Sequence, residues 1–268
     1  MRKVLLVTAF VGLAAVPAYG QQSQPHPDHS DLAKATQNPV GSLIGIPFQW
    51  NGNMNTGPDS SRTTTVVNIE PFVPIGISED WNILARLILP ITFQPVADDG
   101  HLGGFGDSNL SFYLTPKKAG ALIWGAGPSF LLRTATEPSL GSGKWGAGPT
   151  VVVLAMPGHW VLGTLLMQTW SFAGDPERES VSSLLWQYFI NYNLPKGWAI
   201  TSTPTMSVNW NAEGGAAWTV PVGGGIALVT HLGPQHFKLS GQAFWMAARP
   251  EGAASWAWQF TVEPIWPG

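Results

Sequence analysis

The sequence predicts an all-β protein: a transmembrane antiparallel β-barrel of about twelve strands. The first indication is the composition, because charged residues make up only 11% of the 268 residues and hydrophobic ones 44%. A soluble domain normally carries about 25% charged residues. The second is a series of segments in which apolar and polar residues alternate, and the third is an alternation of short and long links between them, as in outer-membrane barrels.

The first residues indicate export. Arg2 and Lys3 precede an apolar run over residues 4–16, and the small residues of 18–20 follow at a cleavage spacing. We therefore predict a signal peptide over residues 1–20 and a location in the bacterial outer membrane. An N-terminal membrane anchor is the alternative, but a spanning helix needs about 20 apolar residues.

The net charge and the cysteine content exclude some classes of partner and of metal site. Removal of Arg2 and Lys3 takes the formal charge from −3 to −5 (−3 minus 2). A chain of this charge offers no basic field to nucleic acid. The absence of cysteine excludes a disulfide scaffold and thiolate metal sites. We expect no metal and no cofactor.

Residues 21–41 form a polar leader, which we expect to be periplasmic or to plug the lumen. Ser30 and Asp31 could cap a short helix over residues 32–37 before Pro39 ends it. Residues 42–268 then form the barrel. The predicted strands are residues 42–51, 62–75, 81–95, 106–115, two in the hairpin 121–156, 159–172, 181–194, 198–211, 216–232, 236–248 and 255–266.

Two of these strands contain the same pentapeptide, Trp-Gly-Ala-Gly-Pro, at residues 124–128 and 145–149. In antiparallel neighbours the two tryptophans should lie at opposite membrane faces. The other tryptophans also gather at strand ends, where indole rings anchor a barrel in the bilayer interface. The predicted anchors are Trp81, Trp124, Trp145, Trp160, Trp198 and Trp210. A soluble β-sandwich would have to expose these aromatic rows to water.

The polar faces of the strands predict the lumen. If strands 62–75 and 81–95 pair about their turn, positions that sum to about 157 face each other, so Glu70 meets Arg86. We favour a structural ion pair over a substrate contact. Thr201 and Thr205 belong to a second, uncharged row. The full set of predicted lumen residues is Asn68, Glu70, Arg86, Asp107, Arg133, Gln187, Asn191, Thr203 and Lys238. Strand 159–172 mixes polar and apolar residues on both faces, so the sequence does not show which of its faces points inward.

Several segments resemble a bacterial outer-membrane family labelled phenol-degradation meta-pathway protein or transporter. They are the hairpin run LIWGAGPSFLLRTATEPSLGSGKWGAGP, ATQNPVGSLIGIPFQWN near the mature start, and the later runs WSFAGD, NYNLPKGW and WTVPVGGGI. The resemblance implies a β-barrel that takes up small aromatic or apolar compounds. It implies no catalytic residues. The chain departs from the pattern at its end, where Pro267 and Gly268 follow Trp266.

We therefore expect an outer-membrane channel for passive passage of small molecules, with the lipid bilayer, a small-molecule solute and the barrel-assembly machinery as partners. The alternative is a sealed structural or adhesive barrel that acts through its extracellular loops, because twelve strands lie between filled and open barrels in width. A membrane hydrolase would need a lipid-facing Ser with His and Asn or Asp on neighbouring strands. The histidines gather at ends and loops, so we expect no enzyme.

Overall fold

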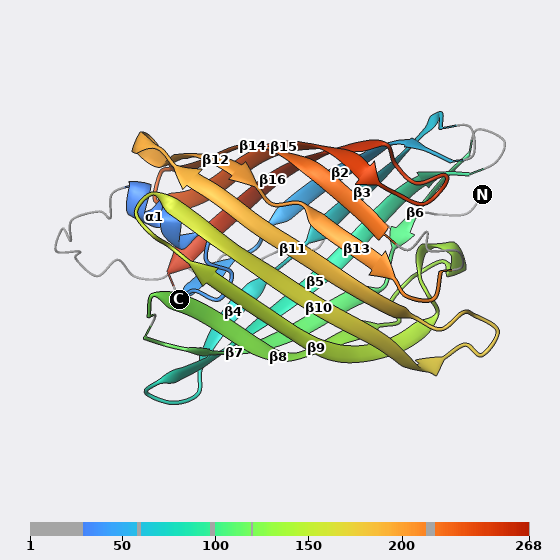
Figure 1. Cartoon of the computed structure of the whole chain (residues 1–268), viewed down its shortest axis with the longest axis horizontal. Helices are drawn as coiled ribbons and strands as arrows, with labels where there is room; N and C mark the ends of the chain where they lie inside the picture. Colours follow the sequence, from blue (N-terminus) through green and yellow to red (C-terminus); the bar gives the residue numbers. More distant parts are fainter. Residues whose placement is uncertain (1–28, 58–59, 97–99, 119, 213–217, 268) are drawn as a thin grey trace, which may run out of the picture.

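The computed structural model describes residues 29–57, 60–96, 100–118, 120–212 and 218–267. These residues form a closed antiparallel barrel (Figure 1). The short helices are α1 (His29–Ala35), η1 (Pro138–Leu140) and η2 (Pro195–Gly197). The strands are β1 (Leu43–Gly45), β2 (Phe48–Thr56), β3 (Arg62–Ile69), β4 (Phe72–Gly76), β5 (Trp81–Pro95), β6 (His101–Phe105), β7 (Ser108–Pro116), β8 (Leu122–Leu132), β9 (Lys144–Ala155), β10 (Trp160–Gly174), β11 (Ser182–Asn193), β12 (Trp198–Ser202), β13 (Thr205–Asn209), β14 (Trp218–Leu232), β15 (Gln235–Ala248) and β16 (Trp256–Pro267). None of the described helices is long and apolar enough to cross a membrane.

The described strands make twelve wall positions, because four positions consist of two short strands each: β1 with β2, β3 with β4, β6 with β7, and β12 with β13. Three of these interruptions contain a proline, at Pro47, Pro71 and Pro204. Proline has no N–H for the ladder, so it interrupts a central strand. The barrel closes where β16 pairs with β2. The predicted fold class and strand number are confirmed.

The repeated pentapeptide lies in the hairpin of β8 and β9. Pro128 of β8 faces Pro149 of β9 in this hairpin. At its other edge, away from β9, β8 pairs with β7. Ser129 and Ala126 take part in this pairing, but the two residues between them do not. The pairing of β9 with β10 has the same two-residue gap, which here covers Gly148 and Pro149. The repeat therefore creates the same interruption twice, on opposite sides of one hairpin.

The two ends of the barrel differ. Short turns join β5 to β4, β8 to β7, β10 to β9, β12 to β11 and β15 to β14 at one end, beside α1 and the C-terminus, and the longer connections gather at the other end (Figure 1). In outer-membrane barrels the short turns are periplasmic. We therefore refer to the end that holds α1 as the periplasmic end.

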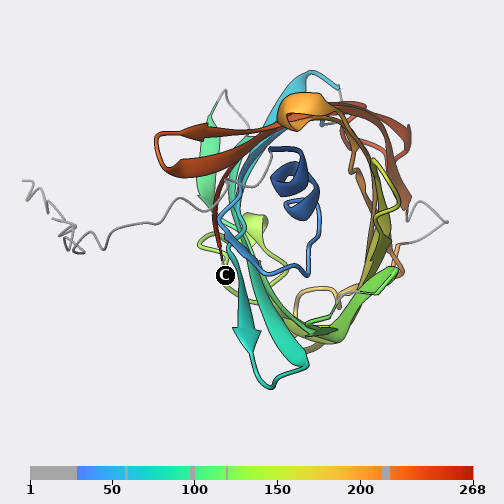
Figure 2. The same cartoon turned by 90° about the vertical axis from the view of Figure 1, so that its left-hand side faces the viewer.

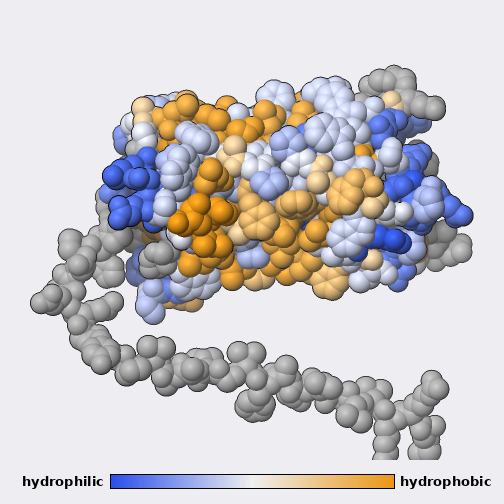
Figure 3. Space-filling view, turned by 90° about the horizontal axis from the view of Figure 1, so that it is seen from below, coloured by the Kyte–Doolittle hydropathy of each residue, from blue (hydrophilic) through white to orange (hydrophobic). Residues whose placement is uncertain are grey.

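The outer wall carries an apolar band between two polar ends (Figure 3). All six predicted anchor tryptophans lie at strand ends, and all but the half-buried Trp81 are exposed. Trp81 packs edge-on against Trp124, with ring centroids 6.0 Å apart. Strand β10 turns its odd-numbered residues inward. Its outward polar residues Thr164 and Gln168 accept hydrogen bonds from the indole N–H groups of Trp186 and Trp210, at 2.8 and 2.9 Å. These hydrogen bonds account for the two polar residues on the outward face of β10.

Helix α1 lies within the outline of the barrel at its periplasmic end (Figure 2). The chain then runs through residues 36–42 to β1, which pairs with β16. Helix α1 and residues 36–39 therefore lie inside this end of the barrel. The predicted signal peptide and residues 21–28 lie outside the described residues.

Candidate functional site

Several polar contacts fix the leader to the periplasmic end of the barrel. The Lys34 ammonium donates to the carbonyl oxygens of Met156 and Gly158, at 2.8 and 2.7 Å, in the turn between β9 and β10. The side-chain amides of Gln37 and Asn193 exchange two hydrogen bonds, at 2.8 and 3.2 Å. These bonds hold the leader against two neighbouring periplasmic turns.

Packing adds to this attachment. Val40 is only 5% exposed and belongs to an apolar cluster with barrel residues. Gly125 makes room for it, because a Cβ there would lie 3.0 Å from a Val40 methyl carbon and 3.2 Å from Tyr113 Cβ. Gly125, the first glycine of the first pentapeptide, is therefore part of the surface against which the leader packs.

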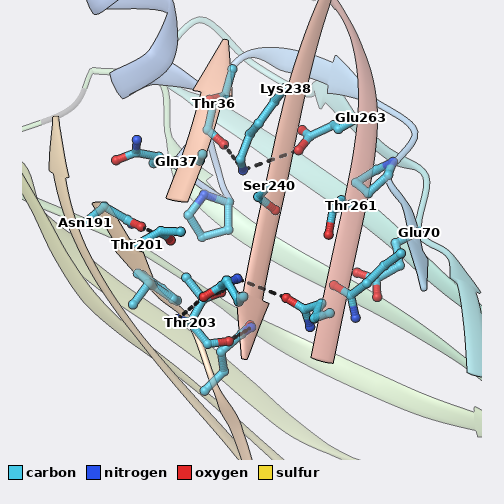
Figure 4. Close-up of a pocket in the computed structure, with 18 of the residues that line it drawn as sticks. Thr36, Gln37, Glu70, Asn191, Thr201, Thr203, Lys238, Ser240, Thr261 and Glu263 are labelled. Atoms are coloured by element: carbon cyan, nitrogen blue, oxygen red, sulfur yellow. Dashed lines mark hydrogen bonds and ion pairs between the residues drawn. The ribbon is translucent and has the colours of Figure 1, made fainter. Parts of the chain in front are cut away.

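Two ion pairs stand in the lumen, and Figure 4 shows the one between Lys238 and Glu263. Arg86 on β5 donates to Glu70, at 2.6 Å, at the break between β3 and β4. The Cα partner of Arg86 is Phe72, since facing positions sum to 158. The predicted pair therefore forms across a diagonal. Lys238 on β15 lies 3.3 Å from Glu263 on β16 and also donates to the Thr36 carbonyl of the leader, at 3.3 Å.

A belt of uncharged hydrogen bonds runs between strands along one side of the lumen. Gln259 of β16 donates to Asn51 of β2, at 3.2 Å, and accepts from Gln242 of β15, at 3.0 Å. Gln242 also accepts from the Thr203 N–H, at 3.0 Å, and Gln187 of β11 donates to the Thr203 carbonyl, at 3.2 Å. Thr203 lies at the break between β12 and β13, where the ladder to β14 is interrupted. Side-chain amides thus replace backbone partners at the break.

On the strands opposite β2 and β3, several inward side chains are apolar. We call this belt, together with Gln49 and Asn53 of β2 and Asn68 of β3, the amide wall. The aliphatic wall consists of inward side chains of β9 and β10, namely Val152, Leu154, Val161, Leu165 and Met167. Leu185 and Phe189 of β11 extend it.

Two cavities lie beside the amide wall, and the aliphatic wall borders them through Leu165, Met167, Leu185 and Phe189. One, of about 170 Å³, is bounded at the periplasmic side by leader residues 36–39 and is lined by both ion pairs. The other, of about 350 Å³, is lined by Asn53 of β2 and Met246 of β15 towards the extracellular side. The cavities share Gln49, Glu70, Arg86, Leu165, Gln187 and Gln259. They therefore adjoin each other along the lumen.

The structure brings seven of the nine predicted lumen residues to these cavities: Asn68, Glu70, Arg86, Gln187, Asn191, Thr203 and Lys238. Asp107 lies apart. Its carboxylate accepts from the Ser142 N–H and hydroxyl, at 2.6 and 2.7 Å, and from the Ala135 N–H, at 3.3 Å. It fastens the loop between β8 and β9. Arg133 follows the last residue of β8 and is exposed, so neither residue lines the lumen.

Sequence reasoning missed part of the site. Glu263 is the partner of Lys238, and Gln242 and Gln259 form the centre of the belt. Their alternation with outward tryptophan and phenylalanine was visible in the sequence. The apolar lumen residues gave no such signal, because a strand with apolar residues on both faces does not show which face is inward.

The described residues contain no group of three or more His, Cys, Asp or Glu side chains placed to hold a metal ion. The residues at the centre of the lumen are amides, hydroxyls and two compensated ion pairs. Such groups bind other molecules by donating and accepting hydrogen bonds.

No family model matches the chain, and no curated protein matches it. Among solved structures, it is similar to an outer-membrane channel from Pseudomonas putida F1, with 15% identity and a TM-score of 0.61, over 85% of this chain and 97% of that one. The CymD monoaromatic hydrocarbon channel gives 9% identity and a TM-score of 0.45, over 89% and 92% of the two chains. A FadL homologue from Pseudomonas aeruginosa gives 7% and 0.42, over 84% and 89%. The likeness to the P. putida channel shows that this chain has the fold of a bacterial outer-membrane β-barrel channel.

Proposed function

We propose that this chain is a passive outer-membrane channel for small, uncharged molecules, including aromatic and apolar ones. The observation that supports the proposal is the pair of adjoining cavities between an amide wall and an aliphatic wall. A purely structural barrel has no need of an apolar inner surface beside open space. The segments that resemble phenol-degradation meta-pathway proteins support the same substrate class, and membership of that family is part of the proposal.

The charges of the lumen favour uncharged solutes. The charged side chains that line the two cavities are Glu70, Arg86, Lys238 and Glu263, which form two pairs. An ion that enters would lose part of its hydration and meet no uncompensated opposite charge. A neutral molecule with apolar surface would instead gain contacts with the aliphatic wall.

The leader sets the width of the path at the periplasmic end, because its residues 36–39 bound the inner cavity. A solute can pass through the lumen only if the leader moves or if the solute takes the narrow path beside the leader. Export, cleavage after residue 20 and insertion by the barrel-assembly machinery belong to the same proposal, as does the absence of an enzymatic activity.

The test is solute flux into liposomes and single-channel current, measured for the mature chain and for a chain without residues 21–41. We expect low conductance from the mature chain and higher conductance from the shortened one. The point variant Gln37→Leu provides a control that keeps the leader but removes its exchange of hydrogen bonds with Asn193. Zero flux from all three proteins in correctly folded form would support a sealed barrel instead.

A further inference from the structure

Two asparagines of the amide wall differ from the other amides around them. Asn51, Gln242 and Gln259 bond to neighbouring groups of the wall. The side-chain amides of Asn53 on β2 and Asn68 on β3 have no hydrogen-bond partner in the part of the chain that the structure describes. Both are half-buried and line the outer cavity. Each therefore presents a free donor and a free acceptor to whatever occupies that cavity.

The two free amides are too far apart for one small molecule to bond with both. Asn68 faces Gln49 across β2 and β3, and Asn53 lies four residues beyond Gln49 on the same strand. A strand rises about 3.3 Å per residue, so the two levels are about 13 Å apart along β2. A ring-sized molecule would contact them one after the other, Asn53 first from the extracellular side.

The same cavity offers each amide an apolar surface. Met167 of β10 and Leu185 of β11 line it, and these strands lie across the barrel from β2 and β3 in the strand order. Phe244 and Met246 of β15 line its outer part. Thioether and aromatic side chains adapt to flat rings and short alkyl chains.

We propose that Asn53 and Asn68 are two successive binding subsites for neutral molecules that carry one hydroxyl or carbonyl group on an apolar body the size of a single ring. The hydrogen-bonding group of the guest meets a free amide while its body packs on the opposite side. A hydrocarbon of the same size lacks the hydrogen bond, and an ion of the same size meets only paired charges. This inference deepens the proposed function and rests on it for the direction of movement.

The test compares three probes of matched size: benzyl alcohol, toluene and benzoate. Binding to the full chain in detergent is measured by ligand-observed NMR, and interruption of the single-channel current is measured in planar bilayers. The variants are Asn53→Leu, Asn68→Leu and the double variant, since leucine keeps the size of the side chain and removes its hydrogen bonds. Asn82→Leu is the matched control. Asn82 lies on β5, next to β3 in the barrel, but lines neither cavity.

We expect each single variant to weaken benzyl alcohol binding at its subsite about three- to tenfold, the range that one net hydrogen bond gives. The double variant should bind benzyl alcohol and toluene alike. Toluene binding, and the behaviour of Asn82→Leu, should stay unchanged. Equal benzyl alcohol binding by wild type and double variant, or stronger binding of benzoate than of benzyl alcohol, would overturn the subsites. Binding without any current would leave the subsites standing and refute the channel.

Discussion

The two sides of the lumen are built on different principles. The amide wall is held by directional bonds that pass from Asn51 through Gln259 and Gln242 to Thr203. The aliphatic wall is held by contact between side chains such as Leu154 and Val161, which are almost fully buried, and it extends to Val40 of the leader. Removal of one amide therefore leaves partners unsatisfied, whereas removal of one aliphatic group leaves space.

This difference shows where each wall can change. A changed contact on the aliphatic wall breaks no hydrogen bond, because apolar contact has no preferred direction. The amide wall keeps its geometry, because it supplies partners to backbone groups at the break between β12 and β13. The ion pair of Glu70 and Arg86 lies where β3 and β4 are interrupted, beyond the β2 end of the belt, and its two side chains bond to each other.

The largest expected effect is the loss of a charge partner. Arg86→Met leaves Glu70, which is 8% exposed, without its ion pair. We expect the free energy of unfolding to fall by about 3 kcal/mol, as for broken buried pairs. Urea unfolding of the folded barrel measures it. The double variant with Glu70→Met should recover most of the loss, and an Arg86→Met barrel as stable as wild type would contradict this role.

The next effect tests the aliphatic wall. Leu165 is 3% exposed and lines both cavities. Leu165→Ala should lower the free energy of unfolding by about 2 kcal/mol, the low end for such truncations, because one side already borders open space. The same variant should raise conductance, since it joins the cavities more widely. Leu162→Ala, on the lipid-facing side of β10, is the control for β10 itself and should leave conductance unchanged.

A smaller loss is expected from the amide wall. Gln242→Leu removes the acceptor of the Thr203 N–H and the bond to Gln259. The unfolding free energy should fall by about 1.5 kcal/mol, with one backbone donor left unsatisfied. Hydrogen exchange at Thr203 should quicken more than exchange at Ile200 of the same wall position. Unchanged protection at Thr203 would show that water replaces the amide without loss.

The smallest effect on stability is expected at the leader. Lys34→Met removes two bonds to turn carbonyls at the partly exposed periplasmic end. Stability should change by about 0.5 kcal/mol or less, because water replaces such bonds readily. Conductance should nevertheless rise or become noisier. Lys118→Met, an exposed lysine of a neighbouring turn, should alter neither quantity.

Much of the fold was predictable from the sequence, because period-two alternation, link lengths and terminal tryptophans report the same barrel. The ion pair of Glu70 and Arg86 was predictable from the turn between their strands, although Arg86 faces Phe72, two residues beyond Glu70. The breaks were not, since prolines such as Pro71 indicate an interruption only once the strand is known to be central. Arg133 was misplaced because the sequence pattern does not show that the strand ends one residue earlier.

The lumen was predictable only on its polar side. Asparagines and glutamines stand out against outward aromatic residues, whereas inward residues such as Leu165 look like lipid-facing ones. Packing of Val40 against Gly125 could not be predicted either, because it joins segments far apart in the chain. The structure adds the information about which apolar residues share a surface.

The facing prolines of the hairpin have a consequence for the way the barrel keeps its alignment. Pro128 and Pro149 can face each other only at one pairing of β8 and β9. Gly127 and Gly148 lie so close to backbone carbonyls of β7 and β10 that a Cβ would stand 2.1 and 1.9 Å from them. A slip of β8 against β7 by one residue would bring Ala126 or Pro128, which carry a Cβ, to that place. The repeated pentapeptide thus sets the register of two adjacent strands. It fixes the stagger on which the circumference of the closed sheet depends.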